Sequence, residues 1–118
     1  MDSRGFIFGS ALAYELNLPF VVVRKAGKLP GEVISVPYQL HYGKDRFEME
    51  QGILSPGQQV VIIDDVVATG GTTIAAGKLV EQLGASVFEV ACFLEFQFLN
   101  ARNVIPYPLF SISKVEGN

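Results

Sequence analysis

Residues 60–73 read VVIIDDVVATGGTT, and the interpretation of the whole chain starts from this stretch. It begins with four consecutive β-branched apolar residues, which are typical of a buried strand. Two adjacent carboxylates, Asp64 and Asp65, follow and are expected to mark the end of that strand. A segment rich in glycine and threonine then leads into residues 76–83, where apolar side chains recur at helical spacing. The stretch therefore predicts a strand, a glycine-rich loop and a helix in succession.

The segments on either side predict further helices and strands. Small and apolar side chains recur at helical spacing in residues 5–16, and Asn17 and Pro19 are expected to end that helix, as Gly84 ends the later one. We expect a buried strand at residues 20–23, further strands at 87–94 and 109–112, an exposed strand at 47–50, and a loop at 35–44 between two short extended pieces. This order indicates that residues 1–118 form a single α/β domain with a mostly parallel sheet flanked by helices.

The composition argues against several classes of protein. The formal net charge of -3 disfavours general nucleic-acid binding, which requires clustered Lys and Arg in excess. No apolar run approaches the ~18 residues needed to cross a membrane, and the first residues lack the order of a signal peptide. Cys92 is the only cysteine and lies in an apolar run, so we expect a core residue rather than a nucleophile. A cytoplasmic protein without nucleic-acid or membrane partners is predicted.

The loop after the two carboxylates has the composition of a phosphate site. Gly70 and Gly71 let a ligand approach the backbone, and the N–H groups at a helix start favour an anion. The hydroxyls of Thr69, Thr72 and Thr73 can add donors. No lysine follows the glycines, so this is not the loop of nucleoside-triphosphate hydrolases. A glycine pair alone favours a simple tight turn, whereas the whole combination of strand, acids and glycine-rich loop favours phosphate binding.

The two carboxylates limit the kind of ligand that can carry the phosphate. They repel a bare polyphosphate, so their partners are expected to be hydroxyls, a metal ion or developing positive charge. A ribose 5-phosphate meets these conditions, because its hydroxyls can donate to Asp64 and Asp65 while its phosphate occupies the loop. Adjacent residues on a regular strand point to opposite faces. Both carboxylates are therefore expected to lie beyond the end of the strand.

Four segments together resemble one enzyme family. Residues 60–73 closely resemble the phosphoribosyl pyrophosphate signature of the type I phosphoribosyltransferases. Residues 2–6 (DSRGF) are similar to the pyrophosphate-binding loop of the adenine-specific branch, and residues 24–31 (RKAGKLPG) to its basic segment. Residues 38–44 (YQLHYGK) are similar to the loop that closes over the active site in that branch. The chain thus resembles the adenine phosphoribosyltransferase family along most of its length, although the basic segment taken alone would be a solvated loop.

The resemblance implies a reaction in purine salvage and a role for each segment. Adenine and phosphoribosyl pyrophosphate would give AMP and pyrophosphate, with Mg²⁺ held mainly through the pyrophosphate and ribose hydroxyls rather than by dedicated protein ligands. Asp64 and Asp65 would stabilise the oxocarbenium-like ribose, and Val66 and Val67 would lie beneath the purine. The phosphate and pyrophosphate would be bound by Arg4, Arg24, Lys25, Lys28, Ala68, Thr69, Gly70, Gly71 and Thr72. A homodimer is also implied.

The resemblance is imperfect at one predicted catalytic position. His41 precedes Tyr42 where the family usually has a glutamate that handles the proton of the adenine ring. A histidine also moves protons near neutral pH. His41 is therefore either a catalytic partner of Tyr42 or an exposed loop residue without a catalytic part.

The resemblance also implies segments that this chain lacks. Family members carry further residues before the position of Met1, which supply a hood over the base and the first core strand. In the family that strand lies between the strands that correspond to residues 20–23 and 60–63, so these two are expected to pair directly or to leave backbone groups unpaired. An N-terminally truncated chain is expected. An inactive truncated paralogue, or a module that only binds phosphoribosyl pyrophosphate or a nucleotide, is the alternative to an enzyme.

Overall fold

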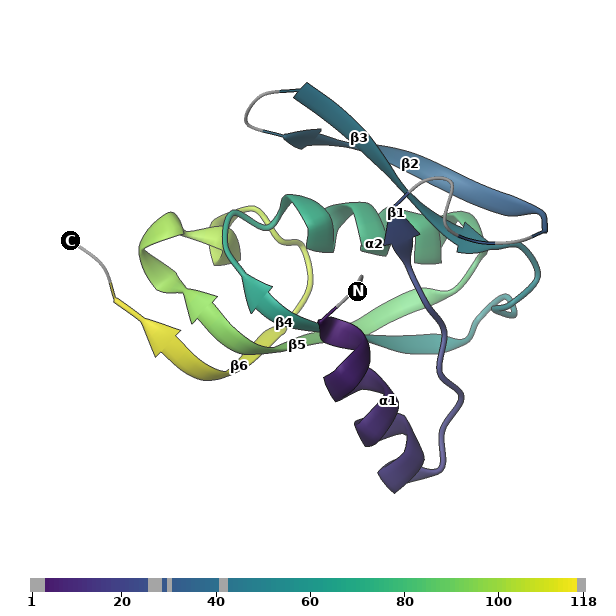
Figure 1. Ribbon diagram of the computed structural model, residues 1–118, viewed down its shortest axis with the longest axis horizontal. Coiled ribbons are helices and arrows are strands. Elements are labelled where there is room, and N and C mark those ends of the chain that lie inside the picture. Colours follow the sequence, from purple (N-terminus) through teal and green to yellow (C-terminus); the bar gives the residue numbers. More distant parts are fainter. Residues whose placement is uncertain (1–3, 26–28, 30, 41–42, 117–118) are drawn as a thin grey trace.

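One helix lies between two three-stranded sheets in the computed structural model (Figure 1). The structure describes all residues except 1–3, 26–28, 30, 41–42 and 117–118. In chain order, the elements are α1 (Gly5–Leu16), β1 (Arg24–Lys25), β2 (Val33–Leu40), β3 (Gly43–Glu50), β4 (Gln59–Val67), α2 (Gly71–Gln82), β5 (Ser86–Phe96), the short 3-10 helices η1 (Gln97–Leu99) and η2 (Ala101–Asn103), and β6 (Leu109–Val115).

The sheet that carries the candidate site has the order β4-β5-β6, with all strands parallel. Helix α2 connects β4 to β5, which confirms the predicted α/β fold with a parallel sheet flanked by helices. The backbones of Asn17 (φ 56°) and Gly84 (φ 83°) turn left-handed at the predicted helix ends. Strand β4 does not end at Asp64 and Asp65, so that prediction is wrong. The strand continues to Val67 because β5 is long enough to pair with it there.

The other sheet is antiparallel, has the order β1-β3-β2 and was not predicted. Residues 35–44 were expected to form a loop, but most of them belong to β2 and β3. Pro37 interrupts the strand pattern in the sequence. The structure tolerates this proline because β2 is an edge strand. Residues 47–50 form a strand as predicted, yet Phe47 and Met49 are buried rather than exposed. They are buried because β3 is the central strand and packs against α2.

Helix α2 is buried on more than one side because it packs against both sheets. Its sequence fits this position. Small residues, Ala75, Ala76 and Gly77, let the neighbouring elements approach, and Leu79 and Val80 fill the core between the sheets. The core is thus centred on α2, and the helix start is held in a fixed place relative to the parallel sheet.

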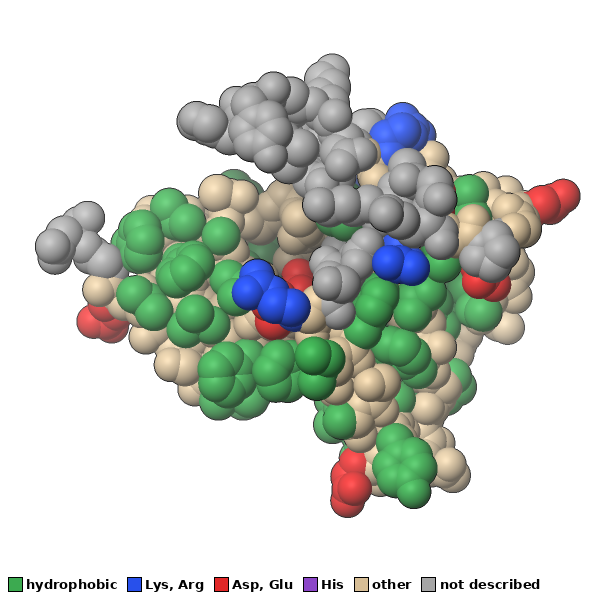
Figure 2. Space-filling view, viewed as in Figure 1, with side chains coloured by type: hydrophobic (Ala, Val, Ile, Leu, Met, Phe, Trp, Pro, Cys, Tyr) green, Lys and Arg blue, Asp and Glu red, His purple; other side chains and the backbone are tan. Residues whose placement is uncertain are grey.

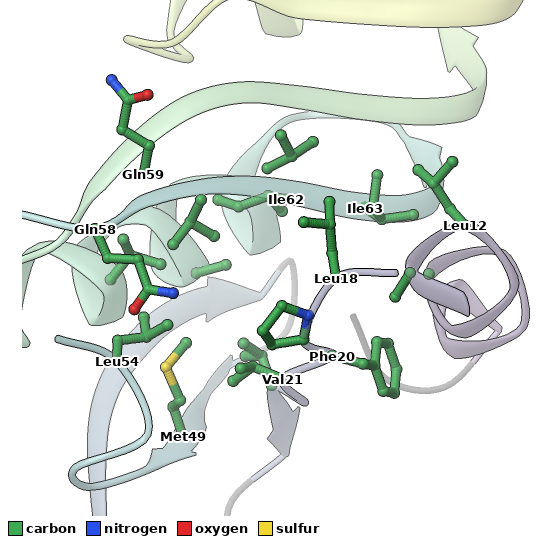
Figure 3. Close-up of a pocket in the computed structure, with 18 of the residues that line it drawn as sticks. Leu12, Leu18, Phe20, Val21, Met49, Leu54, Gln58, Gln59, Ile62 and Ile63 are labelled. Atoms are coloured by element: carbon green, nitrogen blue, oxygen red, sulfur yellow. The ribbon is translucent and has the colours of Figure 1, made fainter. Parts of the chain in front are cut away.

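Residues 20–23 do not form the predicted strand. The chain has no regular secondary structure there, and the two-residue β1 follows directly. Pro19 lacks a backbone donor, and the run does not pair with β4, which among the described residues pairs only with β5. An apolar cavity of about 280 Å³ separates the two, lined by Leu18 and Phe20 on one side and Ile62 on the other (Figure 3).

Large apolar side chains remain on the surface over α1 and the parallel sheet (Figure 2). Phe8 of α1 stacks on Phe93 of β5, with ring centroids 5.6 Å apart and planes 9° apart, and both rings stay partly exposed. Phe110 and Ile112 of β6 are more than half exposed. Within the part of the chain that the structure describes, no helix is long and apolar enough to cross a membrane.

Candidate functional site

The start of α1 lies directly against the two carboxylates of β4. Arg4 Nε is 2.9 Å from Asp65 Oδ2, and this ion pair joins two residues that the sequence had placed in the same site. Gly5 allows the close approach, since a Cβ at that position would lie 3.0 Å from Asp64 Oδ1 and 3.2 Å from Asp64 Cα. Any larger residue at Gly5 would push the helix away. The absence of a side chain here therefore brings the helix start and the carboxylates together.

The two carboxylates have different surroundings. Asp64 is 7% exposed, whereas Asp65 keeps more access to solvent. Asp64 Oδ1 accepts a hydrogen bond of 2.8 Å from the backbone N–H of Asp65. Burial, together with a hydrogen bond between the two side chains, raises the pKa of Asp64 to about 7. Near neutral pH, Asp64 is therefore present in both the protonated and the charged form.

The two carboxylates come together although β4 has not ended. The sequence predicts that both carboxylates can reach one ligand only beyond the end of the strand, because neighbouring side chains on a regular strand point to opposite faces. Asp64 instead bends back onto the backbone of Asp65, and Arg4 reaches Asp65 from the start of α1. The site is thus closed by contacts from α1, which the strand pattern alone does not reveal.

The cations predicted to bind pyrophosphate lie only partly within the described residues. The guanidinium of Arg24 lies over the ring of Phe6, with 5.8 Å between Cζ and the ring centroid, so Arg24 also belongs to the surroundings of the α1 start. Phe6 in turn packs edge-on against Phe20. The backbone of Lys25 pairs with Phe47 in the antiparallel sheet, but its side chain lies outside the described part.

Three predicted site residues cannot be placed. Lys28, His41 and Tyr42 lie outside the described residues, so their roles stay predictions. β2 ends at Leu40 and β3 begins at Gly43, and these two residues are paired.

The predicted phosphate loop, residues 68–72, connects β4 to α2 as expected. Gly70 is the N-cap of α2 with φ 98°, a conformation that few residues other than glycine adopt, and its carbonyl accepts the N–H of Ile74 at 2.9 Å. Thr69 is exposed, and Ala68, Gly71 and Thr72 are half-buried. Among the described residues, the loop thus offers backbone N–H groups and a hydroxyl at the positive end of a helix.

Two valines and one threonine next to this loop have different environments. Val66 is half-buried, but Val67 is 2% exposed and packs in a cluster with Cys92, Ala101 and Ile105. The Val67 side chain therefore belongs to the core, and its place beneath a purine stays a prediction. Thr73 is also buried, and its hydroxyl has no hydrogen-bond partner among the described residues.

The segment between β5 and β6 supplies residues that we did not predict. Behind the phosphate loop, Ala101 and Ile105 face Gly70, and a Cβ on that glycine would lie 3.0 Å from Ile105 Cγ1. Arg102 donates from Nε and Nη2 to both carboxylate oxygens of Glu95, at 3.0 and 2.9 Å. The available signal was a glutamate within the otherwise apolar end of β5, which indicates a buried, paired charge.

Cys92 and the remaining acidic residues of the described part do not add a reactive thiol or a metal centre to the site. Burial raises the pKa of Cys92 to about 11, so its thiol stays protonated, in agreement with the predicted core role. In the part of the chain that is described, no three His, Cys, Asp or Glu residues are grouped to hold a metal ion.

Comparisons with known proteins agree on one family. Residues 1–103 match the model of the phosphoribosyl transferase domain. The chain is 51% identical over 118 residues to the adenine phosphoribosyltransferase of Caldicellulosiruptor saccharolyticus, covering 99% of this chain and 67% of that protein.

Two solved structures show the same likeness. The crystal structure of adenine phosphoribosyltransferase from Thermoanaerobacter pseudethanolicus superposes with a TM-score of 0.94 at 46% identity, over 97% of this chain and 67% of that one. The Trypanosoma brucei enzyme, solved with AMP, pyrophosphate and ribose-5-phosphate, gives 0.88 at 36% identity, over 96% and 53%. The chain therefore spans between about half and two thirds of the length of these relatives.

Proposed function

The chain belongs to the phosphoribosyltransferases, in the adenine phosphoribosyltransferase family, and from this we propose that it binds phosphoribosyl pyrophosphate and adenine and forms AMP and pyrophosphate. The carrying observation is the arrangement at one end of β4. Asp64 and Asp65, the phosphate loop and the start of α1 with Arg4 lie around a single strand end. That arrangement can hold a phosphate, a sugar and an anionic leaving group side by side.

Each part of the substrate has a complementary group. The loop amides at residues 68–72, together with the Thr69 hydroxyl, would bind the 5-phosphate at the start of α2. Asp64 and Asp65 would accept hydrogen bonds from the ribose hydroxyls and stabilise positive charge that develops on the ribose as the pyrophosphate leaves. Val66 would contact the base.

The leaving group would be held by cations. Arg4 is 80% exposed beyond its contact with Asp65, so its remaining donors are free to meet a pyrophosphate oxygen. Arg24 lies near the same helix start, against Phe6, and Lys25 and Lys28 follow in the chain. His41, at the position where the family usually has glutamate, would exchange the proton of the adenine ring, with Tyr42 beside it.

The residues present fit a magnesium ion that is bound mainly through substrate. Mg²⁺ commonly takes one or two carboxylates and completes its coordination with water and phosphate oxygens. Asp64 and Asp65 are the carboxylates that could contribute, and the described residues contain no larger cluster. When bound, the ion would neutralise charge on the pyrophosphate.

An assay of product formation tests the proposal. The purified chain is incubated with labelled adenine, phosphoribosyl pyrophosphate and Mg²⁺, and AMP is measured, with Asp64→Asn/Asp65→Asn as the inactive comparison. AMP formation that the double substitution abolishes supports the enzyme. Saturable binding of phosphoribosyl pyrophosphate without AMP formation would show a binding module instead, and no binding by a folded protein would contradict both. A homodimer, also proposed, is tested separately by sedimentation.

A further inference from the structure

The segment between β5 and β6, residues 97–108, packs against α2 and the residue that precedes it; we call this segment the β5–β6 connection. It contacts α2 at two glycines, seven residues and therefore about two helical turns apart. A Cβ on Gly70 would lie 3.0 Å from Ile105 Cγ1 and 3.4 Å from Ala101 Cβ, and a Cβ on Gly77 would overlap the Tyr107 ring. With no side chain at either glycine, a shift of the connection is passed directly to the helix start.

The connection is itself held by a partly buried ion pair. Arg102 lies next to Ala101 in η2, and both of its carboxylate contacts go to Glu95 near the end of β5, at 3.0 and 2.9 Å. Its third nitrogen, Nη1, donates to the carbonyl of Leu109 at the start of β6, at 2.7 Å. The hydroxyl of Ser111 completes the group by donating to Glu95 Oε1 at 2.8 Å. Arg102 thus ties the connection to both neighbouring strands.

This ion pair differs from an ordinary surface contact. The Glu95 side chain is 1% exposed and that of Arg102 is 40% exposed, so the carboxylate depends on its protein partners. Burial alone raises the pKa of Glu95, but hydrogen bonds from Arg102 and Ser111 outweigh it and leave the pKa below its usual range. Removing the arginine would leave a buried carboxylate with only the Ser111 hydroxyl, which favours a rearrangement of the connection.

We propose that Glu95 and Arg102 are positioning residues for the phosphate loop, acting through the contact of Ala101 and Ile105 with Gly70. Neither residue needs to touch the ligand. The ion pair fixes the connection, the connection fixes Gly70, and Gly70 sets the direction of the N–H groups at the start of α2. The ligand part of this inference rests on the proposed function, which places a 5-phosphate in that loop.

Two readouts separate positioning from general stability. The first is amide hydrogen exchange at Gly70, Gly71 and Thr72, measured by NMR on the ligand-free protein. The second is the ratio of the affinities for AMP and adenosine, which differ only in the phosphate. Arg102→Gln and Glu95→Gln should each speed exchange at these amides and lower AMP affinity about tenfold, the equivalent of one charge-assisted hydrogen bond. Adenosine affinity should stay within about twofold.

Three further variants sharpen the test. Arg102→Lys keeps the charge but not the two-pronged contact, and should recover part of the AMP affinity. The double variant Glu95→Gln/Arg102→Gln should lose no more AMP affinity than Arg102→Gln alone, because both residues act through one contact. Arg46→Gln is the matched control, since Arg46 also donates from two nitrogens to one partner, Ser35, but in the antiparallel sheet. It should leave both readouts unchanged.

The outcomes are distinct. Unchanged exchange at Gly70 and Gly71 in Arg102→Gln would overturn the proposal, even if the variant melts at a lower temperature. An equal loss of AMP and adenosine affinity would also overturn it, because it would show a role in stability alone. If the unsubstituted chain binds neither compound, the proposed function fails, and faster exchange in both glutamine variants would still support the positioning of the loop.

Discussion

Arg4 and Asp65 form an ion pair across the site, with 2.9 Å between Nε and Oδ2, although they lie far apart in the sequence. The arginine is mostly exposed and the carboxylate mostly covered. An exposed pair of this kind stabilises a protein little. Its value is positional, because it places a cation between the carboxylate that would face a ribose and the space in front of α1.

We therefore expect Arg4→Gln to affect ligand binding more than stability. The free energy of unfolding should change by less than about 1 kcal/mol, while the affinity for pyrophosphate should fall by about tenfold through loss of a charge-assisted hydrogen bond. Urea denaturation and calorimetry with Mg²⁺-pyrophosphate measure the two quantities. Lys78→Gln removes one exposed charge from α2 and is the control. An equal loss of pyrophosphate affinity in both variants would point to general charge rather than to Arg4.

The raised pKa of Asp64 makes stability depend on pH. The unfolded carboxyl titrates near 3.8 and the folded one near 7, so between these values the folded protein binds the extra proton. The proton stabilises the folded state at low pH, and this contribution is lost as pH rises through about 7. Asp64→Asn should thus be more stable than the unsubstituted chain at pH 8, by up to about 4 kcal/mol, and similar to it near pH 4.

Urea denaturation of both proteins at several pH values between 4 and 8 checks this prediction. The difference between the two curves removes the contribution of distant titrating groups, which affect both proteins alike. Parallel curves would show that the pKa of Asp64 is ordinary in the folded protein.

Gly70→Ala should damage the phosphate loop for two reasons. At φ 98° an alanine is strained by about 1–2 kcal/mol, and its Cβ would also press on Ile105 and Ala101. Gly52→Ala is the matched control, since Gly52 has φ 75° but no atom within 4 Å of the added Cβ. Both substitutions should destabilise the protein, and only Gly70→Ala should weaken AMP binding. Equal AMP affinity in the two variants would contradict the role of the Gly70 contact.

At Gly77, packing is expected to outweigh helix propensity. Glycine to alanine inside a helix ordinarily stabilises by about 1 kcal/mol, but here the added methyl would overlap the Tyr107 ring, and such overpacking costs about 1–3 kcal/mol. Gly77→Ala should therefore destabilise the protein. In a Tyr107→Ala background the same change should become stabilising, because the obstacle is gone. The two thermal unfolding differences measure this change of sign.

The parallel part of the fold could be predicted from the sequence. The runs at residues 60–63 and 87–94 and the helical spacing at 76–83 are long and regular, and the structure contains β4, β5 and α2 there. The antiparallel sheet could be predicted only at residues 47–50 of β3, where the side chains alternate, because Pro37 interrupts the strand pattern of β2. Residues 20–23 were predicted as a strand and do not form one. They have the composition of a strand, but a strand also needs a neighbour to pair with.

The candidate site was predictable where its residues are consecutive. The two carboxylates and the glycine-rich loop can be recognised directly in residues 64–72. The contacts of Gly5 with Asp64 and of Ala101 with Gly70 join segments that are distant in the sequence. No local pattern contains that information. Glu95 gave a partial signal as a charge in an apolar strand, but not the identity of its partner.

The most direct test of the central claim is a calorimetric titration of the folded chain with Mg²⁺ and phosphoribosyl pyrophosphate. Circular dichroism first confirms that the protein and its Asp64→Asn/Asp65→Asn variant are folded. We predict saturable binding to the unsubstituted chain and at least about a hundredfold weaker binding to the variant, which loses two charged acceptors. Equal binding to both proteins, or no binding to the folded unsubstituted chain, would contradict the assignment of the ligand site to Asp64, Asp65 and the phosphate loop.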